Sequence, residues 1–247
     1  MKIDRARAQK AFADYAAHYN AADAKVKLKI DHTYRVAALC ARIAQSLALP
    51  PEDVDLAWLS GILHDVGRFE QLRRYNTFID AQSVSHAALS VAVLFDEGRI
   101  RDYLDDAGAD ALLRTAVEWH SAFRLPEALD DRTRLFCQIL RDADKIDILR
   151  VNVETPMEEI YNVSTAALRQ SPVTPAVLDA FKDTVEGYKL QSMGVILSYI
   201  CPLMYMNNPL CKKKAVITNS NKLRTYTSAR YYTDAEILDI LSGKEGR

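Results

Sequence analysis

Apolar residues recur along this chain at intervals of three and four, and this spacing constrains the fold more than any other feature. Within the segment 25–49, this spacing is shown by Val36, Leu39, Ile43 and Leu47. Residues spaced in this way share one face of an α-helix. Only 8 glycines and 8 prolines occur among the 247 residues, which leaves few of the turns that a many-stranded sheet needs. The pattern therefore predicts an all-α protein.

Further helices are expected wherever the same pattern lies between helix-ending residues. Pro50 and Pro51 separate the first helix from a second, which we expect to end at Gly67. The stretch 68–82 has no clear period and is expected to be a connection. The remaining expected helices cover 83–98, 109–120, 131–149, 175–193 and 234–242. Because no repeat or low-complexity tract interrupts the chain, we expect one domain over residues 1–247.

Charge and composition exclude several classes of protein. A net charge of −1 argues against a nucleic-acid binder, since such a domain is normally strongly basic. The most apolar stretch, 193–206, has 14 residues and contains Pro202, whereas a helix needs about 20 to span a bilayer. The four cysteines form no Cys-x-x-Cys pair and are expected to be reduced. These features predict a cytoplasmic protein with no membrane partner.

The segment 187–233 differs from the rest of the chain in its charge. It contains seven lysines and arginines and no aspartate or glutamate. Two interpretations stay open for it. One is a solvated surface loop, and the other is a basic flap that attracts a phosphorylated substrate or another anionic partner.

Four of the five histidines lie on apolar helix faces, and these are His32, His64, His86 and His120. His32, for example, precedes Val36 by four residues, so the two share a face. Their rings are therefore expected to point toward the interior of the helical bundle. His18 lies among alanines and tyrosines and is expected to be structural or exposed.

Two carboxylates are expected beside these rings. Asp65 follows His64 directly, and Asp144 lies four residues from both Leu140 and Ile148. A buried ionised carboxylate is costly unless it is paired, hydrogen-bonded or bound to a metal. Histidines and carboxylates that converge from several helices therefore predict a divalent metal site. Each residue also has a plainer interpretation, such as a core histidine or a salt bridge from Asp144 to Arg141 or Lys145.

The order of these residues resembles that of the HD-domain metal-dependent phosphohydrolases. The contexts KIDHTYRV, GILHDVGRFEQ and RDADKID carry the H…HD…D order, and SVSHAAL and VEWHSAF resemble the additional histidines of the subgroups that hold two metals. The likeness covers about residues 25–150 and implies an HD-domain-like helical bundle there. The helical pattern beyond this range separately predicts a C-terminal helical extension over about 151–247. A GYP motif is absent, which argues against the cyclic-dinucleotide phosphodiesterase branch.

The resemblance also implies a ligand set. A first ion would be held by His32, His64, Asp65 and Asp144. A second ion would be held by His86 and His120, with Asp65 bridging the two. Imidazole and carboxylate ligands suit transition metals better than calcium. One or two divalent ions are therefore expected, with Mn, Fe, Ni, Co, Zn and Mg left open.

The activity implied is hydrolysis of a phosphate ester by attack of a metal-activated water. The substrate would be a nucleotide or another small phosphorylated metabolite. Asp65, Arg68 and Lys145 are the candidate catalytic residues, the last two as phosphate contacts. For each of these cations a surface salt bridge is the plainer interpretation. Lys29 lies one turn before His32 and is a third cation on the same face.

Other functions share this ligand order. It also resembles myo-inositol oxygenase and its relatives, which use a di-iron site in the same fold to activate oxygen. A regulatory module that binds a nucleotide without turnover is a third class. The sequence leaves the substrate and the oligomeric state open, and a homodimer is compatible with a helical bundle.

Overall fold

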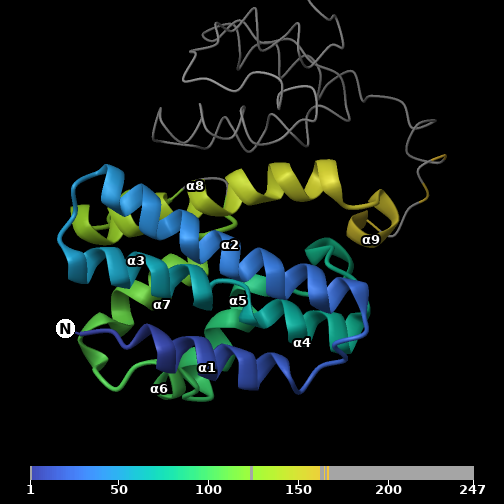
Figure 1. Cartoon of the computed structure of the whole chain (residues 1–247), viewed down its shortest axis with the longest axis horizontal. Helices are drawn as coiled ribbons and strands as arrows, with labels where there is room; N and C mark the ends of the chain where they lie inside the picture. Colours follow the sequence, from blue (N-terminus) through green and yellow to red (C-terminus); the bar gives the residue numbers. More distant parts are fainter. Residues whose placement is uncertain (1, 123–124, 162–163, 165, 167–247) are drawn as a thin grey trace, which may run out of the picture.

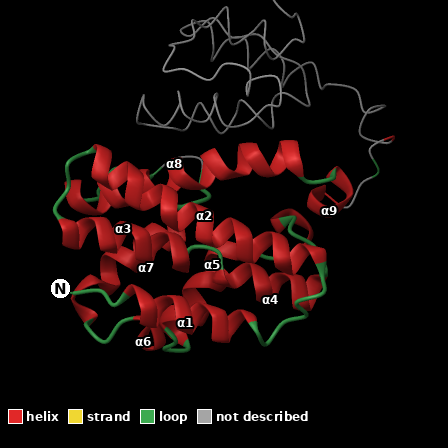
Figure 2. Ribbon diagram, in the orientation of Figure 1, coloured by secondary structure: helices red, strands yellow, loops and turns green. Residues whose placement is uncertain are grey.

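The computed structural model describes residues 2–122, 125–161, 164 and 166, and it confirms the all-α fold (Figures 1 and 2). No strand occurs within these residues. The α-helices are α1 (Arg5–Ala16), α2 (Ala24–Ser46), α3 (Pro51–Leu63), α4 (Val66–Tyr75), α5 (His86–Val91), α6 (Ile100–Tyr103), α7 (Asp110–Trp119), α8 (Asp131–Glu154) and α9 (Met157–Tyr161). Short 3-10 segments are η1 (Asp80–Gln82) and η3 (Ala107–Ala109), and a π-helical turn, η2 (Ala92–Asp96), continues α5.

Capping residues define where several of these helices begin. The side chain of Asp23 accepts a hydrogen bond from the backbone of α2, and Asp130 does the same for α8. Ser85 caps α5 by accepting from the amide of Ala88 at 3.2 Å. Such caps satisfy backbone donors that have no partner inside the helix. They fix the start of three helices that contribute to the site described below.

The helices pack around one apolar interior. α2 packs against α3 and α8, α7 packs against α5 and α8, and α4 packs against α5. Within the described part of the chain, Figure 1 shows α2 and α8 along one side, with α1 and α6 on the opposite side. The largest fully buried side chains include Phe12, Phe69, Phe136, Leu59 and Leu113.

Two glycines allow helices to approach more closely than a side chain would permit. A Cβ atom at Gly61 of α3 would lie 2.5 Å from the Cα atom of Ala37 in α2. A Cβ atom at Gly67 of α4 would lie 2.4 Å from the backbone nitrogen of Ser90 in α5. The amide of Gly67 also donates to the hydroxyl of Ser90 at 2.9 Å. These contacts bring α2 close to α3 and α5 close to α4.

The structure corrects two expectations about the segment after His64. α3 ends at Leu63, and Gly67 lies in the first turn of α4 instead of ending the preceding helix. Much of the expected connection 68–82 is therefore helical. Its apolar face is narrow, because the buried polar residues Glu70 and Gln71 lie between Phe69 and Leu72, and this obscures the period. α1 has no counterpart among the expected helices.

Several sequence predictions lie outside the described residues. They are the helices at 175–193 and 234–242, the basic segment 187–233 and nearly all of the expected C-terminal extension. Among the helices that the structure describes, none has the length and apolar character needed to cross a membrane.

Replacing Gly67 by alanine is expected to destabilise the protein. The added methyl group would clash with the backbone of α5, and overpacking of this kind costs about 1–3 kcal/mol. Urea unfolding followed by circular dichroism measures the loss. Gly108→Ala is the matched control, because its methyl group would meet only the side chain of Asp106, at 3.0 Å. Equal stability of the two variants would contradict the close-approach role of Gly67.

Candidate metal centre

The six predicted ligands come from four helices or their ends and from the junction of two others. His32 lies in the middle of α2, His64 and Asp65 form the junction of α3 and α4, and His86 is the first residue of α5. His120 follows the last residue of α7, and Asp144 lies in α8. None of the six is more than 4% exposed. The fold thus buries together residues that are spread over more than a hundred positions of sequence.

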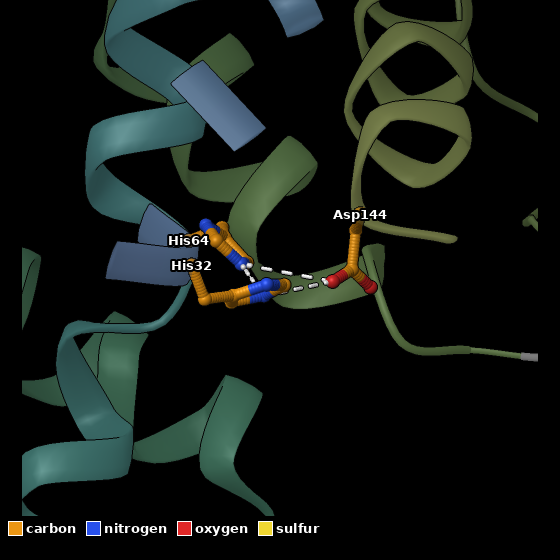
Figure 3. A group of neighbouring side chains, drawn as sticks. All are labelled: His32, His64 and Asp144. Carbon is orange, nitrogen blue, oxygen red and sulfur yellow. Dashed lines mark hydrogen bonds and ion pairs between the residues drawn. The ribbon is translucent and has the colours of Figure 1, made fainter. Parts of the chain in front are cut away.

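His32, His64 and Asp144 meet at one point in the interior (Figure 3). The Nε2 atoms of the two histidines lie 3.3 Å apart. Oδ1 of Asp144 lies 3.2 Å from Nε2 of His32 and 3.8 Å from Nε2 of His64. These three residues have the spacing of a group that could hold a metal ion.

Asp65 lies between this pair of histidines and a second pair. Its Oδ2 atom lies 3.6 Å from Nε2 of His32 and 3.5 Å from Nε2 of His64. Its Oδ1 atom lies 3.7 Å from Nε2 of His86 and 3.6 Å from Nε2 of His120. The Nε2 atoms of His86 and His120 are 3.0 Å apart. The two oxygens of one carboxylate therefore face two different histidine pairs.

Backbone carbonyls fix the tautomer of one histidine in each pair. Nδ1 of His64 lies 2.7 Å from the carbonyl oxygen of Gly61, and Nδ1 of His120 lies 2.7 Å from that of Val117. A carbonyl oxygen can only accept, so each Nδ1 carries the hydrogen. In the neutral rings Nε2 then presents a lone pair toward Asp65.

Carboxylates hold the other histidine of each pair. Nδ1 of His32 donates to Oδ2 of Asp147 at 2.7 Å, and Nδ1 of His86 donates to Oδ2 of Asp80 at 2.6 Å. In all four rings Nδ1 thus donates a hydrogen bond to the surrounding protein, and Nε2 points toward Asp65. A metal-ligating histidine characteristically donates its other ring nitrogen to a carboxylate or carbonyl in this way.

The pKa values of Asp65, Asp144 and His64 favour the protonation states that bind cations. Burial raises the pKa of Asp65, but Lys29 and His64 outweigh it and hold that pKa well below its ordinary value. Asp144 behaves in the same way, with Lys145 and His32 as the main opposing groups. Burial lowers the pKa of His64 to about 3. At neutral pH both carboxylates are charged and His64 is neutral, as metal ligation requires.

The pKa values of His86 and His32, the two histidines held by carboxylates, shift in opposite directions. Burial, reinforced by the charge of Arg68, lowers the pKa of His86 to about 4. Burial and Lys29 act in the same direction on His32, but hydrogen bonds to Asp144 and Asp147 outweigh them and raise its pKa. Nε2 of neutral His86 and Nε2 of His120 face each other at 3.0 Å. Because the Nδ1 atoms of both rings are used in other hydrogen bonds, the two Nε2 atoms are available to a metal, and imidazoles beside a carboxylate are a donor set that fits a divalent transition metal.

Three cationic side chains surround the ligand set. Nζ of Lys29 lies 2.7 Å from Oδ2 of Asp65, and Nζ of Lys145 lies 2.5 Å from Oδ2 of Asp144. Nε of Arg68 lies 3.7 Å from Oδ1 of Asp65. They compensate the two buried carboxylates. Contact of Arg68 or Lys145 with a phosphate stays a prediction.

Arg68 also joins α4 to the loop that follows it. Its Nη1 atom donates to Oε1 of Gln71 at 2.7 Å, to the carbonyl of Phe78 at 2.6 Å and to Oδ1 of Asp80 at 3.0 Å. Sequence reasoning did not identify Asp80, which lies in a segment without a helical period. Asp147 was also missed, although its position three residues after Asp144 on the same helix was a usable signal. His18 is exposed, in agreement with the expectation for it.

Comparison with known protein families gives one match. The model of the HD domain matches residues 30–149. The chain carries an HD domain. All six candidate ligands lie inside the matched range. Proteins with HD domains are generally metal-dependent hydrolases, and this supports the capacity of the buried histidine–aspartate groups to hold metal. Neither the curated proteins nor the solved structures contain a match to this chain.

Lys29→Met is expected to destabilise the metal-free protein by about 3 kcal/mol, because the buried carboxylate of Asp65 loses its nearest cation and keeps only the weaker contact with Arg68 at 3.7 Å. Unfolding in urea after treatment with a chelator measures the loss. Addition of Mn²⁺ should restore more stability to this variant than to the wild type, since the cation replaces the missing charge. Lys27→Met, at an exposed position of α2, is the control. Equal losses for both variants would show that the pair of Lys29 with Asp65 contributes nothing.

Proposed function

We propose that the HD domain binds two divalent cations and hydrolyses a phosphate ester of a nucleotide or another small phosphorylated metabolite. The observation that carries this proposal is the position of Asp65. Its two oxygens face the His32–His64 pair and the His86–His120 pair at 3.5–3.7 Å. A single carboxylate between two sets of imidazoles has the arrangement expected of a bridging ligand.

The ligands divide into two sets that share Asp65. The first ion would be held by His32, His64, Asp65 and Asp144, and the second by His86, His120 and Asp65. With three or four protein ligands to each ion, coordination positions stay open for water and substrate, as a catalytic site requires. The closed ligand shell of a structural zinc site would leave none.

When bound, the cations would supply Lewis acidity that makes water acidic enough to attack phosphorus, together with positive charge for the phosphate oxygens. The protein's own residues have separate tasks. Asp65 and Asp144 bring negative charge into the interior, and the hydrogen bonds of the four Nδ1 atoms hold the rings in one orientation. Burial of the whole set excludes bulk water, which strengthens the electrostatic interactions inside the site.

We assign Arg68 and Lys145 to the phosphate group. Their side chains are 14% and 13% exposed, so each reaches the boundary between the ligand set and solvent. A guanidinium can bind two phosphate oxygens at once, and an ammonium supplies a compact charge. Lys145 also lies 3.4 Å from the carbonyl of His120, which places it beside residues of both ion sites.

Asp65→Ala is expected to abolish turnover and to lower metal content at the same time, because both ions lose a ligand. Hydrolysis of a panel of nucleotides and sugar phosphates, with Mn²⁺ or Fe²⁺ supplied, measures activity. Elemental analysis of the same preparations measures metal. His18→Ala removes an exposed histidine and should leave both quantities unchanged.

Two results would count against the proposal. An Asp65→Ala variant with full turnover would exclude the metal-dependent mechanism. No hydrolysis of any panel member by wild-type protein shown to hold two irons would instead favour the oxygenase chemistry of the myo-inositol oxygenase type.

His86→Ala or His120→Ala is expected to remove the second ion and leave the first. The reason is that Nε2 of each of these residues lies beside Oδ1 of Asp65, whereas His32, His64 and Asp144, which would hold the first ion, stay intact. The metal content should fall from two ions per chain to one, as measured by elemental analysis after dialysis. Retention of two ions in both variants would contradict the binuclear assignment.

A further inference from the structure

We propose that Asp80 is a positioning residue that prepares His86 for the second ion, and that Asp147 does the same for His32 and the first ion. The inference rests on the proposed binuclear centre and deepens it. It names residues outside the ligand set that determine how tightly each ion is held.

Asp80 fixes both the ring and the backbone of His86. Its Oδ2 atom accepts from Nδ1 of His86 at 2.6 Å and faces the backbone amide of the same residue at 3.4 Å. His86 is the first residue of α5, so its backbone amide has no partner within that helix. One carboxylate oxygen therefore sets the direction of the imidazole relative to the start of the helix that carries it.

The carboxylate of Asp80 is itself held in place. Its Oδ1 atom accepts from Nη1 of Arg68 at 3.0 Å and from Nε2 of Gln71 at 2.8 Å. Gln71 is fully buried and also donates to the hydroxyl of Ser83 at 2.9 Å. Both donors belong to α4, the helix that begins directly after Asp65. The same helix thus follows the proposed bridging carboxylate and anchors the residue that orients His86.

Asp147 has an equivalent position beside the other pair. It accepts from Nδ1 of His32 at 2.7 Å. Arg150 holds it with two hydrogen bonds, from Nε at 2.7 Å and from Nη2 at 2.9 Å. Each histidine pair consequently contains one ring held by a carboxylate and one held by a carbonyl. A carboxylate hydrogen-bonded to Nδ1 fixes the ring and makes Nε2 a stronger donor to a metal.

A plainer role for Asp80 would be a structural ion pair with Arg68. The side chain of Asp80 is 37% exposed and lies in the loop between α4 and α5, so an ion pair there adds little to stability. Its two hydrogen bonds to α4 and its contact with a ring that is 4% exposed are better explained by orientation of that ring. The two roles predict different results for metal binding.

The test is a titration of the chelator-treated 247-residue chain with Mn²⁺, monitored by isothermal titration calorimetry. Asp80→Ala is expected to weaken the second ion by about 10- to 100-fold and leave the first unchanged. Asp80→Asn should fall between this variant and the wild type, because its amide oxygen can still accept from Nδ1. Asp147→Ala should weaken the first ion instead. Asp96→Ala, at an acidic residue paired with Arg114 on the surface, is the matched control.

Titration with Co²⁺ gives a second readout that a purely structural role would not change. The visible absorption of the second Co²⁺ equivalent reports the geometry around His86, so Asp80→Ala should alter that spectrum and leave the spectrum of the first equivalent intact. The unfolding midpoint of the metal-free variant should stay near that of the wild type, because Asp80 is partly exposed.

The outcomes separate this inference from the function on which it rests. If wild-type protein binds fewer than two ions, the binuclear centre is wrong and Asp80 has no ion to serve. Suppose that the wild type binds two ions and that the dissociation constant of the second ion in Asp80→Ala is within twofold of the wild-type value. Only the positioning role of Asp80 is then wrong. Equal weakening of both ions by Asp80→Ala or Asp80→Asn, together with a lower unfolding midpoint, would assign Asp80 a structural role.

Discussion

The burial of the Asp65 carboxylate is the constraint on which the rest of the site depends. An ionised carboxylate that is 2% exposed is costly unless other groups compensate its charge. Lys29 supplies a positive charge at 2.7 Å, and four imidazole nitrogens lie at 3.5–3.7 Å from the two oxygens. Because every one of these groups must reach the same carboxylate, the helices that carry them must converge on the junction of α3 and α4.

The backbone makes that convergence possible in two places. Gly61, which lies one turn before His64, lets α2 approach α3. Gly67, which lies two residues after Asp65, lets α5 approach α4. The carbonyl of Gly61 also accepts from Nδ1 of His64, so the same turn directs the ring inward. Close helix packing and histidine orientation are therefore parts of one arrangement, which explains the glycines three residues before His64 and two residues after Asp65.

Sequence reasoning succeeded where the signal was periodic and local. The helical spacing predicted the helix of His32, and the apolar positions around Asp144 predicted its burial, which the structure confirms. It failed for α4, where buried Glu70 and Gln71 interrupt the apolar period. Asp80 was missed for a different reason. Its loop has no periodicity, and its importance depends on contacts with Arg68, Gln71 and His86 that only the folded chain creates.

Residue types and their spacing were enough to predict the helical class, the inward faces of the histidines and the identity of the groups available to bind a cation. These properties follow from residue type and from spacing along a single helix, so they require no knowledge of how helices pack. The tertiary structure decided which oxygen of Asp65 faces which histidine pair and which carboxylate holds each ring. Those relations join residues from different helices at distances of a few ångströms, and only the packing of the helices fixes such distances.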